Sequence, residues 1–302
     1  MVDLSMTVAG VHFSRPVVLA SGVMDEDAGS MIRMVEGGAA GVVTKSIGLI
    51  ARTGHCNPTV VEVQGGWLNA MGLPNPGIDE YVGEIAAFKK VCHVPVIGSI
   101  FGANAEEFCR LARRMQQSGV QAIELNVSCP HAKGFGLQLG CDSELVEEIV
   151  SAVKSEVSLP VFVKLSPNVT DIVKIGCAAV DGGADGLVAI NTIKAMAIDI
   201  DLRTPVLSNR FGGLCGPAIK PVGIRCIYEL FEAVDVPLIG VGGVSSGRDL
   251  IEYVMAGASL VQLGIGVAHR GISVFSSVVD EAAVWMKDNE IESLAELVGV
   301  AH

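Results

Sequence analysis

The amino-acid sequence predicts an α/β protein of the (β/α)8 TIM-barrel type, with residues 1–302 forming one domain. Three observations lead to this prediction: eight short apolar runs recur along the chain, amphipathic segments separate them, and glycine is abundant while aromatic residues make up only 5%. Many glycines suit tight turns between strands and helices, which favours an α/β protein over an all-β sandwich or a helical bundle. A chain of this length can build one large core but is too short for two full-sized catalytic domains.

The predicted strands are continuous apolar runs rather than alternating ones, as expected for strands that are covered on both faces. They are Arg15–Ser21, Ala40–Ser46, Val94–Ile100, Gln121–Val127, Leu159–Leu165, Gly186–Asn191, Val236–Gly242 and Ser259–Ile265. Eight strand-then-helix units on a chain of this length favour a closed parallel barrel. An open doubly wound sheet is the alternative, but no G-x-G-x-x-G turn follows the first strand.

Amphipathic segments between these runs predict the helices. Clear examples are Asn104–Ser118, Asp142–Val157 and Asn168–Gly182, where Asp or Asn lies near the start and Gly near several ends. Two connections, Ile47–Pro76 and Ile193–Gly216, are longer than a barrel requires. Long loops after barrel strands lie over the ligand-binding face, so we expect both to carry function.

The composition excludes several classes of function. A formal net charge of −12 argues against a nucleic-acid or anionic-membrane surface, because both require clustered Lys and Arg. No basic segment followed by a long apolar run is present, so we expect neither a signal peptide nor a membrane span, and we expect a cytoplasmic protein. The eight cysteines contain no C-x-x-C pair, so no zinc or iron–sulfur spacing occurs and no metal site is predicted.

Polar or glycine residues stand at the carboxyl end of every predicted strand. They are Ser21-Gly22, Thr44-Lys45-Ser46, Ser99, Asn126-Val127-Ser128-Cys129, Lys164, Asn191-Thr192, Gly242-Gly243 and Gly264. Each one alone is explained equally well as a polar residue entering a loop. In a barrel, however, these ends converge on one mouth, so together they predict a single site.

The last two strands predict a phosphate site. Gly242-Gly243 and Gly264-Ile265-Gly266 follow them, where barrels often hold a phosphate on backbone N–H groups, although ordinary turn glycines are an equally good account of these residues alone. Lys45 and Lys164 end apolar runs, where an ammonium group needs an anion to meet it. The two lysines therefore favour an anionic, electron-rich ligand.

Cys129 lies just beyond the fourth strand, in the segment NVSCPH. A thiolate is a competent base near neutral pH when cations or backbone dipoles lower its pKa from about 8.5. The other seven cysteines are best explained as buried small hydrophobes, whereas the position of Cys129 at the mouth favours a catalytic role. His131 is interpreted as a surface or lid residue.

With these residues in place, the chain resembles the class 1 dihydroorotate dehydrogenases over essentially its whole length. The motifs that carry the resemblance are Asn69–Gly77 (NAMGLPNPG), Asn126–His131 (NVSCPH), Lys164–Asn168 (KLSPN), Asn191-Thr192 and Gly212–Pro217 (GGLCGP). The stretch Ile198–Pro221 and the Asn-Pro-Gly at Asn75–Gly77 are more similar to the NAD-linked 1B subclass than to the fumarate-reducing 1A subclass. NVSCPH and KLSPNVTDIV are also similar to the flavin barrel of dihydropyrimidine dehydrogenase.

The resemblance implies oxidation of (S)-dihydroorotate to orotate in de novo pyrimidine biosynthesis, with FMN across the barrel mouth. Cys129 would take a proton from C5 as a hydride leaves C6 for the flavin. The implied FMN contacts are Ser21, Lys45, Ser46, Ser99, Asn126, Lys164 and Ile190, with the phosphate on Gly216, Gly242, Gly243, Gly264 and Ile265. The implied substrate contacts are Lys45, Asn69, Ala70, Met71, Gly72, Leu73, Asn126, Asn191 and Thr192.

The 1B resemblance also implies a partner. In that subclass electrons reach NAD⁺ through a second subunit that carries FAD and a [2Fe–2S] cluster, in a heterotetramer built around a homodimer of the catalytic subunit. The present sequence has neither cluster spacing nor a dinucleotide fingerprint after any strand. It also lacks an amphipathic N-terminal extension, which argues against docking on a membrane to reduce quinone.

The chain departs from the family pattern at Ser99, where an Asn usually contacts the flavin, at Ile265, where Thr or Ser is common, and at His131, where Asn is common. His131 matches dihydropyrimidine dehydrogenase, so a reductase of that kind stays an alternative, as does the fumarate-linked 1A enzyme. From the fold alone, a Schiff-base aldolase using Lys164 or Lys45 and a non-catalytic phosphate-binding barrel are further alternatives.

Overall fold

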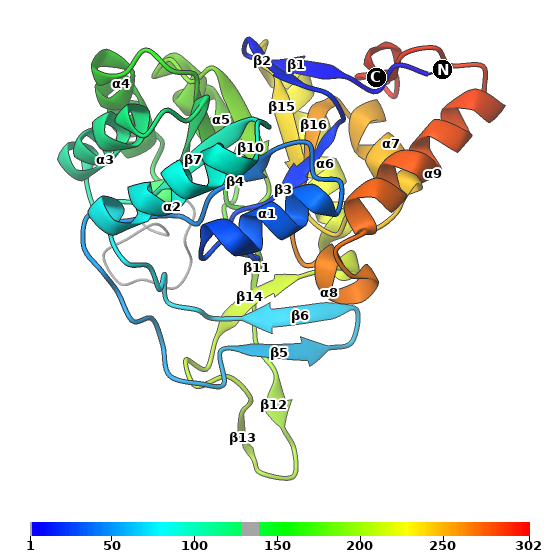
Figure 1. The fold of residues 1–302 in the computed structure, drawn as a ribbon. Helices are drawn as coiled ribbons and strands as arrows, with labels where there is room; N and C mark the ends of the chain where they lie inside the picture. The colour runs from blue at the N-terminus through cyan, green and yellow to red at the C-terminus, as the bar shows by residue number, and fades with distance from the viewer. Residues whose placement is uncertain (1, 128–138) are drawn as a thin grey trace.

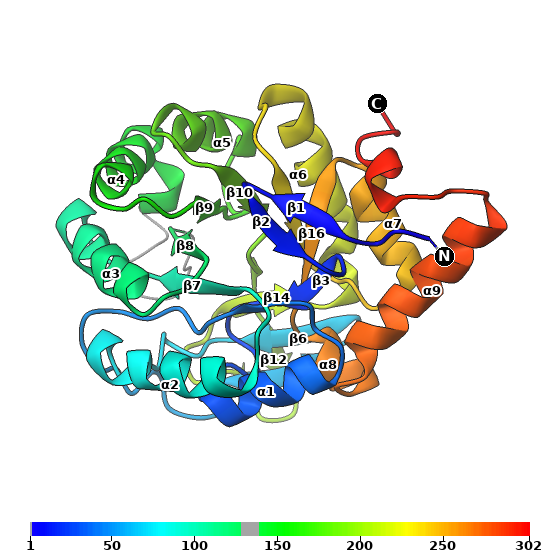
Figure 2. The same ribbon diagram turned by 45° about the horizontal axis from the view of Figure 1, so that its top comes forward.

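Eight parallel strands close into a barrel in the computed structural model, which describes residues 2–127 and 139–302 (Figures 1 and 2). Around the barrel they follow one another in the order β10-β15-β16-β3-β4-β7-β8-β9. Their bounds are β3 (Val17–Leu19), β4 (Val42–Val43), β7 (Val96–Ile100), β8 (Ala122–Asn126), β9 (Val161–Lys164), β10 (Gly186–Ala189), β15 (Leu238–Val241) and β16 (Ala258–Leu263). Each coincides with one of the eight predicted runs, so the predicted TIM barrel is confirmed.

Helices surround the barrel and cover its outer face (Figure 2). They are α1 (Ala28–Glu36), α2 (Ile78–Val91), α3 (Ala105–Gln117), α4 (Ser143–Glu156), α5 (Ile172–Asp181), α6 (Lys220–Ala233), α7 (Gly247–Met255) and α9 (Val274–Asp288). The short helix α8 (Gly266–Arg270) lies instead at the carboxyl end of the strands, beside β6 (Gly66–Asn69) (Figure 1), and 3₁₀ turns are formed by η1 (Leu139–Cys141), η2 (Pro217–Ile219) and η3 (Leu294–Leu297). Asn104 and Asp142 cap α3 and α4 as predicted. The predicted helix Asn168–Gly182 begins later, because Asp171 is the residue that accepts the capping bond.

One end of the barrel is closed by apolar packing. The hairpin of β1 (Met6–Val8) and β2 (Val11–Phe13) lies across it, and Val8 and Phe13 are fully buried. They pack against the inward-facing residues of the barrel strands, which are Val18, Val43, Ile97, Ala122, Phe162, Val188, Ile239 and Leu260. Because this end is filled, a ligand can enter the barrel only at the opposite, carboxyl end of the strands.

The two long connections fold together into a second sheet at that carboxyl end (Figure 1). Its strands are antiparallel and run in the order β11-β14-β6-β5. They are β5 (Val60–Val63), β6 (Gly66–Asn69), β11 (Ile193–Ala195) and β14 (Gly212–Cys215), and the short hairpin β12 (Ile198–Asp199) and β13 (Thr204–Pro205) extends from them. The sequence predicted long functional loops here, but not a sheet shared between them.

Among the helices of the described chain, none combines the length and the apolar character needed to cross a lipid bilayer.

Candidate active site

A cavity of about 350 Å³ lies between the carboxyl ends of the barrel strands and the second sheet. This volume falls within the roughly 300–1,000 Å³ typical of small-molecule sites. Seventeen of the predicted site residues line it: Ser21, Lys45, Ser46, Asn69, Met71, Gly72, Leu73, Asn126, Lys164, Ile190, Asn191, Thr192, Gly216, Gly242, Gly243, Gly264 and Ile265. Residues separated by most of the chain are therefore gathered at one mouth, as the barrel topology requires.

Within the described part of the chain, two predicted site residues are not in this wall. Ser99 is fully buried behind Ser46, and Ala70 is buried in the second sheet against Leu68 and Leu207. Ser99 and Ala70 therefore support the wall, and their direct contacts with ligands stay predictions. Cys129 lies outside the described residues.

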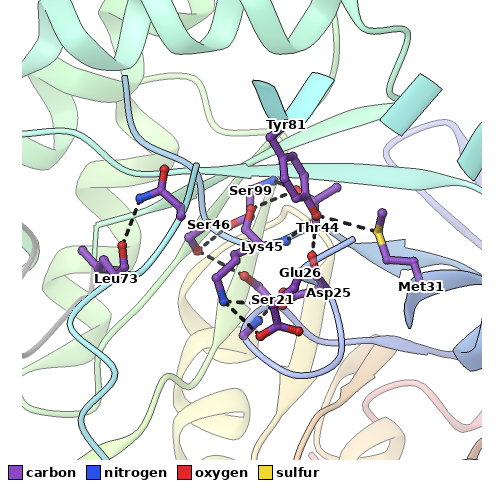
Figure 3. A network of polar contacts seen from close by, with 12 residues as sticks. Ser21, Asp25, Glu26, Met31, Thr44, Lys45, Ser46, Leu73, Tyr81 and Ser99 are labelled. Carbon is purple, nitrogen blue, oxygen red and sulfur yellow. Dashed lines mark hydrogen bonds and ion pairs between the residues drawn. The ribbon is translucent and has the colours of Figure 1, made fainter. Parts of the chain in front are cut away.

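Lys45 follows β4 and is held by acidic side chains (Figure 3). Its Nζ lies 3.5 Å from Glu26 Oε1 and 3.8 Å from Asp25 Oδ1. Asp25 is completely buried, and its other carboxylate oxygen accepts a 2.5 Å hydrogen bond from the Gly22 amide. Burial raises the pKa of the Asp25 carboxyl to about 6, although the Lys45 charge opposes this rise. The cation is thus tied to the loop between β3 and α1.

Tyr81 joins the same cluster from α2. Its hydroxyl donates a 2.6 Å hydrogen bond to the Asp25 carbonyl oxygen and accepts one of 3.3 Å from the Lys45 amide (Figure 3). Burial, together with the nearby Asp25 carboxylate, raises the pKa of Tyr81 well above its ordinary value. The phenol therefore stays neutral and fixes the backbone that carries Lys45.

Hydroxyl groups connect the next positions around the mouth. Ser46 Oγ lies 3.1 Å from Ser21 Oγ and 2.8 Å from Ser99 Oγ, and it accepts a 2.9 Å bond from Asn126 Nδ2. Four different strand ends are joined through this one hydroxyl. The arrangement holds the polar side of the cavity wall in one geometry, which is what a site that must orient a ligand requires.

Close backbone approaches shape the opposite side of the cavity. Gly216, Gly242 and Gly243 have φ angles of +104°, +128° and +73°, which side chains rarely adopt. A Cβ atom on Gly243 would lie 2.8 Å from the Gly216 carbonyl oxygen and 2.8 Å from Lys220 Cβ. Only glycine therefore fits at Gly243, and this region presents backbone rather than side chains to the cavity.

The loop after β6 is held by a single buried amide. Asn75 Oδ1 accepts bonds from the Gly77 amide (2.9 Å) and the Gly48 amide (3.3 Å), and Asn75 Nδ2 donates to the Leu73 carbonyl oxygen (2.9 Å). Asn69 Nδ2 donates a 3.2 Å bond to the Gly213 carbonyl oxygen and so joins this loop to β14. The predicted motif Asn69–Gly77 is therefore a structured wall of the cavity.

Several residues near the cavity were not predicted as site residues. They are Asp25, Trp67, Glu124, Cys215, Gln262 and His269. Trp67 and His269 lie against each other edge to face, with ring centroids 4.0 Å apart. Glu124 and Gln262 are polar residues inside apolar runs. A polar residue in such a run is also the signal by which Lys45 and Lys164 were predicted as site residues. That signal was available for them in the sequence.

Comparison with known proteins gives a consistent result. A sequence model described as dihydroorotate dehydrogenase matches residues 3–286. The chain is 52% identical over 302 residues to the protein named dihydroorotate dehydrogenase B (NAD(+)), catalytic subunit, of Methanocaldococcus jannaschii, covering 99% of this chain and 98% of that protein. The proteins of the same name from Thermoplasma acidophilum and Pyrococcus furiosus are 50% and 47% identical, and each match covers 99% of the relative.

The fold also matches a solved structure. The crystal structure of the Eimeria tenella dihydroorotate dehydrogenase in complex with ferulenol superimposes with a TM-score of 0.85, covering 99% of this chain and 89% of that one. Sequence identity in this comparison is 21%, so the match establishes the fold alone.

Proposed function

The chain belongs to the dihydroorotate dehydrogenase family, whose enzymes are flavin-dependent oxidoreductases, and we propose that it oxidises (S)-dihydroorotate to orotate in pyrimidine biosynthesis as a 1B catalytic subunit. The observation that carries this proposal is the single cavity in which Lys45, Lys164 and the Asn69–Leu73 loop meet a glycine-rich backbone. These groups provide cations for an anionic substrate and cofactor, a wall to orient them and a place for a phosphate.

The cavity suits FMN. On one side, Gly216, Gly242, Gly243, Gly264 and Ile265 would hold the phosphate, because the close backbone approach at Gly243 leaves no room for a Cβ and this side of the cavity presents backbone groups to an anion. On the other side, Ser21, Lys45, Ser46, Asn126, Lys164 and Ile190 would contact the ring, and Ser99 would support it through Ser46. When bound, FMN supplies the hydride acceptor.

Dihydroorotate is a carboxylate with a ring of amide groups, and the remaining wall offers matching partners. Lys45 would attract the negative charge, while Asn69, Asn126, Asn191 and Thr192 provide amide and hydroxyl groups for the ring. The backbone from Ala70 to Leu73 would close over the substrate, with its shape maintained by Asn75. Together these residues would hold C6 of the substrate toward the flavin and C5 toward the base.

Cys129 is the proposed base. Its thiolate would remove the proton from C5 while the hydride leaves C6, so the substrate loses H⁺ and H⁻ and gains one C=C bond. Support for this assignment comes from the motif NVSCPH, which begins at the cavity residue Asn126 and places Cys129 three residues later.

Electrons are proposed to leave through a separate subunit that carries FAD and a [2Fe–2S] cluster, in a heterotetramer around a homodimer, with NAD⁺ as the final acceptor. Two findings support this: the relatives are named catalytic subunits of an NAD(+) enzyme, and the 302-residue sequence contains no C-x-x-C pair.

The decisive experiment is the visible spectrum of the purified chain during anaerobic addition of dihydroorotate. We expect one FMN per chain, bleaching of its absorbance and formation of an equal amount of orotate. Dihydrouracil, added in place of dihydroorotate, should leave the flavin oxidised. Release of FAD, or a colourless protein that fails to bind added FMN, would overturn the proposal, and bleaching by dihydrouracil alone would indicate a dihydropyrimidine dehydrogenase.

A further inference from the structure

A layer of buried polar side chains lies inside the barrel, directly below the cavity. Ser99, Glu124, Lys164 and Gln262 come from β7, β8, β9 and β16, and each is at most 5% exposed. Barrel interiors are normally filled by apolar residues, as in the layer at the closed end of this barrel. Four polar residues at this depth are costly unless every group has a partner, so their arrangement requires an explanation.

Glu124 is the centre of this layer. Its Oε2 accepts a 2.7 Å hydrogen bond from Gln262 Nε2, and its Oε1 accepts one of 3.2 Å from Ser99 Oγ. The same Oε1 lies 3.8 Å from Lys164 Nζ. Both oxygens of the buried carboxylate therefore have partners.

The contact between Glu124 and Gln262 spans the barrel. In the closed strand order, β8 and β16 are separated by three strands on either side, so the two side chains meet across its full width. The orientation of the Gln262 amide follows from its partners, because a carboxylate only accepts and an ammonium only donates. Gln262 Nε2 faces Glu124, and Gln262 Oε1 accepts a 3.1 Å bond from Lys164 Nζ.

Glu124 itself does not reach the cavity, whereas Lys164 and Gln262 both line it. The carboxylate can therefore act on a ligand only through these two side chains and through its own charge. That charge partly cancels the positive field of Lys164, and both groups are buried, where charges interact more strongly than in water.

We propose that Glu124 is a positioning residue that holds Lys164 and Gln262 under the flavin and sets the reduction potential of the flavin. The inference rests on the proposed FMN site. Bound FMN would gain negative charge on reduction, and Lys164, which lines the cavity, would stabilise that charge. The carboxylate of Glu124 keeps this stabilisation moderate, so that the reduced flavin still passes its electrons on.

The test compares Glu124→Gln and Glu124→Asp with the wild-type chain. The Glu124→Gln amide preserves the size of the side chain and removes its charge. The ratio of the affinity for reduced flavin to the affinity for oxidised flavin should therefore be at least tenfold higher than in the wild type. For a two-electron couple this equals a rise in midpoint potential of about 30 mV. The shorter Asp keeps the charge but moves it away from Lys164, so its potential should rise by less.

A matched control is Glu229→Gln, which removes a carboxylate from an exposed pair with Arg225 on α6. The midpoint potential of the flavin in Glu229→Gln should equal that in the wild type. The measurement is a spectroscopic redox titration of the FMN-loaded chains against reference dyes, with thermal unfolding and FMN dissociation recorded in parallel.

The outcomes separate the two proposals. A wild-type chain that binds no FMN would overturn the proposed function and this inference with it. An unchanged or lowered potential in FMN-loaded Glu124→Gln would overturn the inference alone and leave Glu124 a structural residue. If Glu124→Gln does not fold, Glu124→Asp decides in the same way, because an unchanged potential there also contradicts a role in setting it.

Discussion

At the scale of single residues, the two lysines of the mouth are each neutralised before any ligand arrives. Lys45 lies beside Asp25 and Glu26, and Lys164 lies beside Glu124. A buried ammonium without a partner would cost several kcal/mol, so the neighbouring carboxylates stabilise both lysines in the folded protein. The same carboxylates limit how strongly each lysine attracts an anionic ligand.

The first prediction concerns Cys129. Replacing it with Ala should leave FMN bound and slow flavin reduction by dihydroorotate by at least roughly 10²-fold, because a positioned base contributes that much. Cys129→Ser should recover little, since a serine hydroxyl is a far weaker acid and has no partner base in this motif. Stopped-flow absorbance of the flavin measures the rate.

The control for Cys129 is Cys177→Ala, because Cys177 lies on α5, half-buried and away from the cavity. Dihydroorotate should reduce the flavin of this variant at the wild-type rate. A wild-type rate in Cys129→Ala would show that another group takes the proton.

The second prediction concerns Asp25, whose pKa is raised from an ordinary 3.8 to about 6 by burial. Between about pH 6 and pH 4 the Asp25 carboxyl is protonated in the folded state but ionised in the unfolded state. Acidification through this window therefore favours folding. Relative to Asp25→Asn, the wild-type free energy of unfolding should therefore rise by up to roughly 3 kcal/mol between pH 7 and pH 4.

Urea unfolding of both Asp25 proteins across this pH range measures the difference, in which the titration of other groups largely cancels. A difference that stays constant from pH 7 to pH 4 would mean that the Asp25 carboxyl titrates normally in the folded protein.

At the scale of elements, the close approach of β14 and the turn after β15 forms the glycine-rich side of the cavity. Gly243→Ala, the third prediction, places a Cβ against the Gly216 carbonyl oxygen in a left-handed conformation. We expect FMN affinity to fall at least tenfold and the free energy of unfolding to fall by about 1–3 kcal/mol. Fluorescence titration with FMN and chemical unfolding measure the two effects.

Gly83→Ala is the matched control, because Gly83 lies on an exposed face of α2 and an added Cβ there meets nothing within 4 Å. It should leave FMN binding unchanged and stabilise the protein by about 0.5–1 kcal/mol through helix propensity. Equal FMN affinity in the Gly243→Ala protein and the wild type would mean that the phosphate lies elsewhere.

At the scale of the whole molecule, the two ends of the barrel differ. The β1–β2 hairpin fills one end with apolar side chains, whereas the other end carries the cavity and the second sheet (Figure 1). The proposed substrate and cofactor would therefore both enter the barrel from one face.

The fourth prediction follows from this arrangement and from the sequence. The isolated FMN-loaded chain should oxidise dihydroorotate with an artificial dye as acceptor, but should not reduce NAD⁺ until an iron–sulfur flavoprotein partner is added. Steady-state turnover of the pure chain with NAD⁺, fumarate and a dye measures this. Efficient turnover with fumarate would place the chain in the 1A subclass, and efficient turnover with NAD⁺ alone would contradict the need for a partner.

Much of the site was predictable because its signals are local. Each barrel strand is a short apolar run, and polar residues such as Lys45, Asn126 and Lys164 stand at the strand ends, where a parallel barrel gathers them. The motif Asn69–Gly77 likewise predicted a cavity wall. The predicted single domain and the role of Cys129 stay predictions.

Only the tertiary structure decided which distant residues meet. The pairing of β6 with β14 joins residues more than 140 positions apart. Neither short strand has a periodic sequence pattern from which its partner strand could be predicted. Closure of the barrel also places Ser99 behind Ser46 and against Glu124, and its contact with the flavin stays a prediction. Hydrophobic periodicity determines where strands and helices form, but contacts across a closed barrel depend on its strand order and register, which no local pattern contains.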